Sequence, residues 1–155
     1  MSRGTIGTTI LAGGLLGLAW AQWGGELGPG QAAAAAPTQT RAFGTCGGGA
    51  RTNCVVDGDT FWMDGEKIRI ADIDTPETHP SRCAAEADLG SRATIRLRML
   101  LNDGPFALES IDRDMDRYGR KLRIVTRGGG SIGDILIAEG LARPYAGGRR
   151  PWCAV

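Results

Sequence analysis

The sequence predicts an α+β fold, in which a small closed barrel of five β-strands carries two to three packed helices. Three features support this prediction. Five short apolar segments are bounded by turn-forming residues, a long amphipathic segment follows the third of them, and all of them lie within residues 51–155. Five strands with a long helix after the third, in so short a domain, indicate a barrel with helices packed on it.

Three strands precede the long helix and are predicted over residues 54–56, 60–63 and 67–73. The turn formers Asp and Gly at residues 57–58 separate the first two strands. The same pair at residues 64–65 is a strong two-residue hairpin signal between the second and the third. Apolar and polar residues alternate in the third strand, which places Ile68 and Ile70 on one face and Arg69 on the other.

The remaining elements are a helix over residues 84–101, strands over 106–111 and 121–126, and a short helix over 132–139. Leucine and alanine recur at helical spacing in the long segment, so one stripe of it is apolar. Ser131 is placed to cap the short helix, and Gly140 ends it. Among small barrels, the OB-fold fits this order of elements best.

Residues 1–21 indicate an export signal. Arg3 is the only charge before Glu26, residues 10–21 are mostly Leu, Ala and Gly, and residues 19–21 give the small-x-small pattern that signal peptidase needs. An uncleaved membrane anchor is the alternative, since the uncharged stretch approaches the ~20 residues that a span requires. In either case we expect the folded part to be secreted or periplasmic. Residues 22–50 are rich in Gly, Ala, Pro and Thr and indicate a flexible linker.

Four cysteines, Cys46, Cys54, Cys83 and Cys153, fit an exported domain. They include no C-x-x-C pair, and His79 is the single histidine of the sequence that could join them as a ligand, which argues against a zinc site. Three disulfide pairings are open, and the sequence does not choose among them. We favour a local Cys46–Cys54 bridge and a Cys83–Cys153 bridge that ties down the C-terminus; free buried thiols are the alternative.

Charge is distributed unevenly, although the net charge of the chain is only +1. Residues 41–112 hold 8 basic and 12 acidic residues, whereas residues 113–155 hold 9 basic and 4 acidic ones. An acidic segment that could hold a cation therefore precedes a basic segment that could hold a polyanion.

Hydrolysis of a phosphodiester needs charge neutralisation at the phosphate, an oriented water and a stabilised leaving alkoxide. Asp59 and Asp74, with a backbone carbonyl, offer the oxygen ligands of a hard cation. Arg69 and Arg120 can bind phosphate oxygens with two hydrogen bonds each, and Glu77 could serve as general base or orient the water. Each of these short motifs alone is more often an ordinary turn or a surface charge.

Together these motifs resemble those of the thermonuclease, or staphylococcal-nuclease-like, family. The resemblance covers most of residues 54–145 and is carried by Val-Asp-Gly-Asp-Thr at 56–60, Ile-Arg-Ile-Ala-Asp-Ile-Asp-Thr-Pro-Glu at 68–77, Asp-Arg-Tyr-Gly-Arg at 116–120 and Glu-Gly-Leu-Ala at 139–142. It implies an OB-type barrel and a Ca²⁺-dependent nuclease that cleaves DNA and RNA, single-stranded or as frayed duplex, with little sequence preference and leaves 3′-phosphates.

The resemblance also implies residue roles. The metal ligands would be Asp59, Asp74 and the carbonyl of Thr75, and the catalytic residues would be Arg69, Glu77 and Arg120. Arg117, Tyr118 and Tyr145 would contact the substrate, although Pro144 and a shifted spacing weaken the match at Tyr145. Nothing in the sequence indicates a protein partner, so a monomer is expected.

Two other functions compete with an active nuclease. An OB barrel could bind nucleic acid without cutting it, but such modules typically lack one or more of the charged catalytic residues, and all six implied site positions are retained here. A structural calcium domain would leave Arg69 and Arg120 without a reason to converge.

Overall fold

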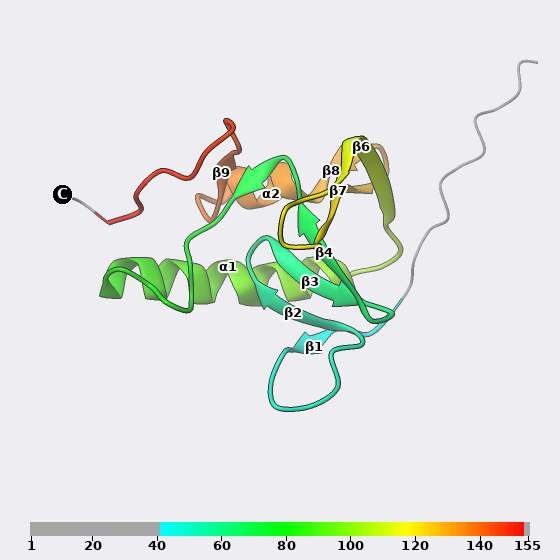
Figure 1. Cartoon of the computed structure of the whole chain (residues 1–155), viewed down its shortest axis with the longest axis horizontal. Helices are drawn as coiled ribbons and strands as arrows, with labels where there is room; N and C mark the ends of the chain where they lie inside the picture. Colours follow the sequence, from blue (N-terminus) through cyan, green and yellow to red (C-terminus); the bar gives the residue numbers. More distant parts are fainter. Residues whose placement is uncertain (1–40, 154–155) are drawn as a thin grey trace, which may run out of the picture. The chain divides into compact units, whose positions relative to one another are not determined.

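The computed structural model describes residues 41–153 (Figure 1). The predicted export signal or anchor, and the predicted linker as far as residue 40, lie outside the described residues. Within the described part, no helix combines the length and the apolar character that crossing a bilayer would need.

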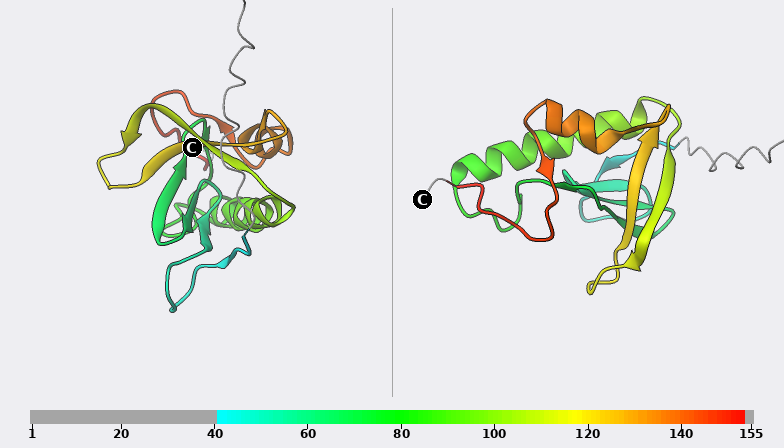
Figure 2. Two further views of the ribbon diagram at one scale, coloured as in Figure 1. Left: turned by 90° about the vertical axis from the view of Figure 1, so that its right-hand side faces the viewer. Right: turned by 90° about the horizontal axis from the view of Figure 1, so that it is seen from above.

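The described chain has two helices and nine strands, so the α+β class is confirmed (Figures 1 and 2). The helices are α1 (Ala84–Asn102) and α2 (Ile132–Ala138). The strands are β1 (Gly44–Thr45), β2 (Cys54–Asp57), β3 (Thr60–Met63), β4 (Glu66–Ile70), β5 (Ile73–Asp74), β6 (Ala107–Met115), β7 (Lys121–Arg127), β8 (Gly130–Ser131) and β9 (Arg143–Pro144).

Strands β2, β3 and β4 form an antiparallel meander, as the sequence predicts. Strand β4 then pairs in parallel with β7, which pairs antiparallel with β6, so the main sheet follows the order β1-β2-β3-β4-β7-β6. Strand β8 adds to β7, and β5 and β9 form a separate two-stranded sheet. The described pairing is an open path, so it does not reproduce the closed five-stranded barrel that the sequence analysis expects.

The third predicted strand divides in two. Residues 66–70 form β4, and the chain bends at residues 71–72 before β5 begins at Ile73. Strand β5 pairs with β9 instead of continuing the main sheet, because Ile73 and Asp74 oppose Pro144 and Arg143. The bend separates Asp74 from the strand that carries Arg69 and brings the C-terminal segment of the chain next to it.

The hairpin between β3 and β4 turns through Asp64 and Gly65, which both have positive φ, 52° and 80°. Two left-handed residues in succession form the type I′ turn whose twist matches paired strands, and Asp-Gly is favoured there because both residues tolerate that conformation. The sequence prediction for this turn is confirmed.

The apolar core lies between the sheet and the two helices, which contact each other (Figure 2). The predicted stripe of α1 faces this core: Ala93, Leu97 and Leu101 are fully buried. Phe43 also belongs to the core, where its ring packs against those of Phe61 and Phe106. The predicted linker reaches residue 50, so this boundary is too late: a buried aromatic anchors the chain before it, and β1 follows directly.

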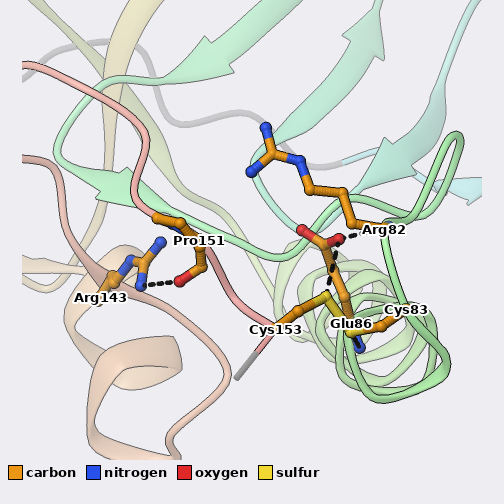
Figure 3. Close-up of a disulfide and its surroundings, with 6 residues drawn as sticks. All are labelled: Arg82, Cys83, Glu86, Arg143, Pro151 and Cys153. Carbon is orange, nitrogen blue, oxygen red and sulfur yellow. Dashed lines mark hydrogen bonds between the residues drawn. A yellow bond between two sulfur atoms is a disulfide. The ribbon is translucent and has the colours of Figure 1, made fainter. Parts of the chain in front are cut away.

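Both favoured disulfides are present, Cys46–Cys54 and Cys83–Cys153. The first closes a loop between β1 and β2. The second joins the residue that caps α1 to the C-terminal segment (Figure 3). The sequence allowed three pairings, and the fold selects this one because only these sulfur atoms are brought together.

We expect the two disulfides to differ in their contribution to stability. Replacing Cys83 and Cys153 by serine should lower the free energy of unfolding by about 4 kcal/mol, because this bridge spans 70 residues. The matched double variant at Cys46 and Cys54, which spans 8 residues, should lose only about 2–3 kcal/mol. Denaturant unfolding of the two variants measures both losses. Equal losses would contradict the loop-length argument.

Candidate functional site

The register of the sheet gathers the candidate residues. Asp59 lies in the turn before β3, and Thr60, the first residue of β3, pairs with Arg69 of β4. Arg69 pairs in turn with Leu122 of β7, so Arg120, which directly precedes β7, comes to the same edge. Thr60 and Arg120, which are 60 positions apart in sequence, thereby lie side by side.

A buried ion pair between Asp59 and Arg69 lies at the centre of the site. The hydroxyl of Thr60 donates to Asp59 Oδ1 at 2.8 Å, and Arg69 donates to the carbonyl oxygen of Ile73 at 3.2 Å. Burial alone would raise the pKa of Asp59 and lower that of Arg69. The attraction between the two charges outweighs burial, so the pKa of Asp59 is lowered and that of Arg69 is raised.

Asp57 lies beside Asp59 and behaves in the opposite way. Burial, and then the negative charge of Asp59, raise the pKa of Asp57 to about 7. Asp57 Oδ1 accepts a hydrogen bond from the backbone N–H of Asp59 at 3.2 Å. The pKa values of the two neighbouring carboxyl groups therefore move in opposite directions, and Asp59 is the one that stays ionised.

Arg120 is held in place by Asp116. Its Nε donates to Asp116 Oδ2 at 2.6 Å, and its backbone N–H donates to Asp116 Oδ1 at 3.0 Å. Burial would raise the pKa of Asp116, but the hydrogen bonds from Arg120 and from the N–H of Tyr118 lower it. Arg120 Nη1 also donates to Thr60 Oγ1 at 3.4 Å. Thr60 thus links Arg120 to Asp59, and the two predicted catalytic arginines converge.

Asp74 is buried and paired with an arginine that the sequence analysis did not single out. Arg143 Nε and Nη2 donate to Asp74 Oδ2, both at 3.1 Å. Arg143 also donates to the carbonyl oxygen of Pro151 at 3.2 Å (Figure 3). It donates to the carbonyl oxygen of Arg150 as well, and it lies over the ring of Trp152 at 3.9 Å. Arg143 therefore joins Asp74 to the segment that Cys153 ties to α1.

Glu77 sits in the loop between β5 and α1 and pairs with Arg149 of the same C-terminal segment. The loop rests directly on α1, because Gly90 lacks a side chain: a Cβ there would lie 2.7 Å from the carbonyl oxygen of Pro76 and 3.1 Å from that of Glu77. The close approach of α1 therefore fixes the position of the loop that carries Glu77.

Two adjoining hollows divide the site. The larger one, which we call the basic groove, has a volume of about 870 Å³ and is bordered by Arg69 and Arg120 together with Lys67, Arg113, Arg117, Tyr118, Tyr145 and Arg149. The smaller one, the recess, is bordered by Asp74, Thr75, Glu77, Arg82, Glu86, Arg149, Arg150 and Trp152. Arg149 borders both. Asp59 borders neither, because Arg69 covers it.

The predicted substrate contacts lie around the groove. Tyr118 is 67% exposed and Tyr145 is 40% exposed. Arg120 and Arg117 lie over the Tyr118 ring at 5.5 and 4.8 Å, and Arg69 lies over the Tyr145 ring at 5.5 Å. Two accessible aromatic rings therefore lie against the two predicted catalytic arginines.

The residues also fit a hard cation. Asp74 Oδ1 is buried and accepts no hydrogen bond within the described part of the chain, so one carboxylate lone pair faces the site without a donor. Across residues 41–153, no three side chains of the His, Cys, Asp and Glu types cluster as a metal site. Asp74 and Thr75 border the recess, whereas Asp59, the other carboxylate that the sequence analysis expects to bind the cation, borders neither hollow.

Residues 67–151 match the family model described as "Staphylococcal nuclease homologue", which is more than half of the chain. The chain belongs to the staphylococcal nuclease family. The match begins within β4 and ends in the C-terminal segment, so it includes Arg69, Asp74, Glu77 and Arg120. The resemblance that the sequence motifs indicate is confirmed.

Two curated Bacillus subtilis (strain 168) proteins are similar to this family member: "Endonuclease YncB" and "SPbeta prophage-derived endonuclease YokF". Each is 39% identical over 94 residues, which is 57% of this chain. The matched region is 44% of the first relative and 31% of the second. The chain therefore spans less than half of the length of these relatives.

Sequence reasoning missed Arg143 and Arg149. Both follow the last recognised motif, in a stretch with no strong helical or strand pattern. One signal was available: Arg149 and Arg150 lie close to Cys153, and a disulfide from Cys153 to the start of α1 returns this segment to the loop that carries Glu77. The predicted bridge therefore indicated that the C-terminal segment lies near Glu77, but it did not indicate which side chains form contacts.

Asp57 makes the stability of this family member pH-dependent. Its pKa rises from an unfolded value of about 3.9 to about 7, so the folded state alone binds this proton between those values. Stability should therefore fall as the pH rises from about 4 to about 7 and level off above, and Asp57→Asn should remove this component. Unfolding free energies of both proteins, measured in chelator across this range, give the difference. A difference that does not change with pH would contradict the assignment.

Proposed function

We propose that this chain is an exported, Ca²⁺-dependent nuclease that hydrolyses phosphodiester bonds of DNA and RNA with little sequence preference and leaves 3′-phosphates. The single observation that carries the proposal is the convergence of two arginines on adjacent, hydrogen-bonded residues: Arg69 pairs with the buried carboxylate of Asp59, and Arg120 donates to Thr60. Membership of the staphylococcal nuclease family and two relatives named as endonucleases support it.

Arg69 and Arg120 are assigned to the phosphate. Each guanidinium is planar and can donate two parallel hydrogen bonds, a geometry that matches two phosphate oxygens. Both are pre-oriented by carboxylates, Asp59 and Asp116, so little reorganisation is needed when a phosphate arrives. As negative charge develops on the phosphate and on the departing 5′-oxygen, these donors stabilise it more than they stabilise the ground state.

Asp59, Asp74 and the backbone carbonyl of Thr75 are assigned to the cation. They offer oxygen ligands, which Ca²⁺ prefers, and Asp59 stays ionised because its pKa is lowered. When bound, Ca²⁺ would add positive charge beside the phosphate oxygens. Asp59 also pairs with Arg69, so the aspartate holds a phosphate-binding group as well as a cation ligand position.

Glu77 is assigned to the attacking water. Its carboxylate lies in the recess together with Asp74 and Thr75, and it pairs with Arg149. It can act as the general base, or it can orient the water by accepting a hydrogen bond; both roles need the same carboxylate in the same place.

The fold and the cellular setting complete the proposal. Family membership supports an OB-type arrangement of the strands, although the described sheet is an open path, and we assign the domain to a monomer that acts on single-stranded nucleic acid or frayed duplex. Residues 1–21 act as an export signal, or as an N-terminal anchor if they are not cleaved. A linker follows, and the nuclease domain includes Phe43 and all that comes after it. The two disulfides support an oxidising location, secreted or periplasmic.

Cleavage of single-stranded DNA should require calcium, the two arginines and Glu77. The oxidised chain should degrade DNA with calcium and not with chelator. Arg120→Ala or Glu77→Ala should each lower kcat at least about 100-fold, because each removes a group that acts in the transition state. The matched control is Arg92→Ala, on the exposed side of α1. Binding without cleavage by the unmodified chain would instead indicate a non-catalytic binding module.

Asp59→Asn should weaken calcium binding at least about tenfold, since it removes one ligand charge while preserving side-chain size. Titration calorimetry without substrate measures this affinity. Asp88→Asn, an exposed carboxylate on α1, is the control and should leave the affinity unchanged. Thermal unfolding in chelator must accompany the titration, because Asp59 also pairs with Arg69. An unaltered affinity in folded Asp59→Asn would refute its role as a ligand.

A further inference from the structure

One face of the main sheet carries more cationic side chains than the reaction site needs. Side chains alternate along a strand, so Lys67 and Arg69 of β4 project from the same face. On the neighbouring strands, Leu122 of β7 and both Ile111 and Arg113 of β6 line the same hollow. The basic groove therefore crosses three paired strands, β4, β7 and β6, and extends to both sides of Arg69 and Arg120.

The groove concentrates positive charge. It is bordered by six cationic side chains and one carboxylate, Asp116, in a chain whose net charge is only +1. A generally basic surface therefore does not explain it. The pairing differs within the set: Arg69, Arg120 and Arg149 each face a carboxylate, whereas Lys67 and Arg113 form no ion pair among residues 41–153. Arg117 forms no ion pair in this part of the chain either, but it donates to the hydroxyl of Tyr118 at 2.6 Å. Lys67 and Arg113 are thus the two cations left to bind an external anion.

Lys67 has a defined place beside Arg69. Two residues along a strand separate their Cα atoms by about 6–7 Å, and the side chain of Lys67 reaches over the ring of Trp62 at 5.9 Å. A phosphate next to the one assigned to Arg69 lies within reach of a flexible ammonium at this distance. Arg113 lies on β6, two strands away from Lys67, and can meet a phosphate on the opposite side of the assigned one.

The walls of the groove favour unpaired bases. Tyr118, in the turn before β7, and Tyr145, after β9, both border the groove and expose much of their rings. The β6–β7 hairpin, whose turn carries Tyr118, extends away from both helices (Figure 2). An aromatic ring can stack on a base only when that base has left its own stack, which is easy in a single strand and costly in a duplex.

We propose that the basic groove is a track for an extended single-stranded polynucleotide, in which Lys67 and Arg113 bind the phosphates that flank the scissile one. The proposal rests on the proposed function for the identity of the central phosphate. The track predicts that affinity and catalytic efficiency grow with strand length beyond a dinucleotide, because each added phosphate gains a cation that the reaction itself does not use.

The test compares the whole oxidised chain with the double variant Lys67→Gln/Arg113→Gln. Binding of a fluorescent oligothymidylate of about twelve nucleotides is measured in chelator, so that no cleavage is needed. The variant should bind roughly tenfold more weakly at moderate salt. Its slope of log affinity against log salt should be shallower by about 1.4, about 0.7 for each lost phosphate contact. An unchanged slope would overturn the proposal.

A dinucleotide with a single phosphodiester separates flanking contacts from the reaction. The double variant should cleave this dinucleotide with kcat/KM within about twofold of the unmodified chain, and the longer strand roughly tenfold less efficiently. Equal losses on both substrates would place Lys67 and Arg113 at the scissile phosphate or in the fold, and would also overturn the proposal. A duplex of the same length that binds as tightly as the single strand would refute the single-stranded track.

The matched control is Arg41→Gln/Arg92→Gln, which removes two positive charges from side chains that do not border the groove and that pair with Asp64 and Asp88. It should change neither the salt slope nor the ratio of long to short cleavage. One outcome separates the two proposals. If the unmodified chain cleaves neither substrate with calcium, the nuclease proposal fails. If the double variant still shows the shallower salt dependence of binding in chelator, the flanking phosphate sites remain supported.

Discussion

The buried ion pair between Asp59 and Arg69 is the constraint on which the site depends. It fastens the turn before β3 to β4 and, through the carbonyl of Ile73, to β5. Two charges removed from water are costly unless each keeps its partner and its remaining hydrogen bonds, and here Thr60 and Ile73 supply them. Losing either partner would leave an unpaired buried charge, so the geometry of the site and the stability of this corner are tied together.

The same principle recurs across the site, where each candidate acidic group faces a guanidinium. Arg143 faces Asp74 and Arg149 faces Glu77, and both arginines come from the C-terminal segment. That segment is fastened to α1 by the disulfide at Cys153. Carboxylates placed close together repel one another, so these arginines balance the negative charge of the acidic groups beside the basic groove.

Much of the fold follows from local rules. The Asp-Gly hairpin, the apolar stripe of α1 and the β2–β4 meander were predictable because turn residues and periodicity report on neighbours in sequence. The division of the third strand and the core position of Phe43 were not. Both depend on partners far along the chain, β9 for the strand and Phe106 for the ring, and composition near a residue carries no record of a distant partner.

The sequence by itself determined the chemistry: which residue types are present, the motifs that indicate the family, and a cysteine set suited to two bridges. Only the tertiary structure decided which side chains pair with each other. It paired Arg69 with Asp59, chose Arg143 as the partner of Asp74, and left Lys67 without a carboxylate within the described chain. The physical reason is that ion pairs and hollows form between segments remote in sequence, whose relative placement follows from the packing of the whole core.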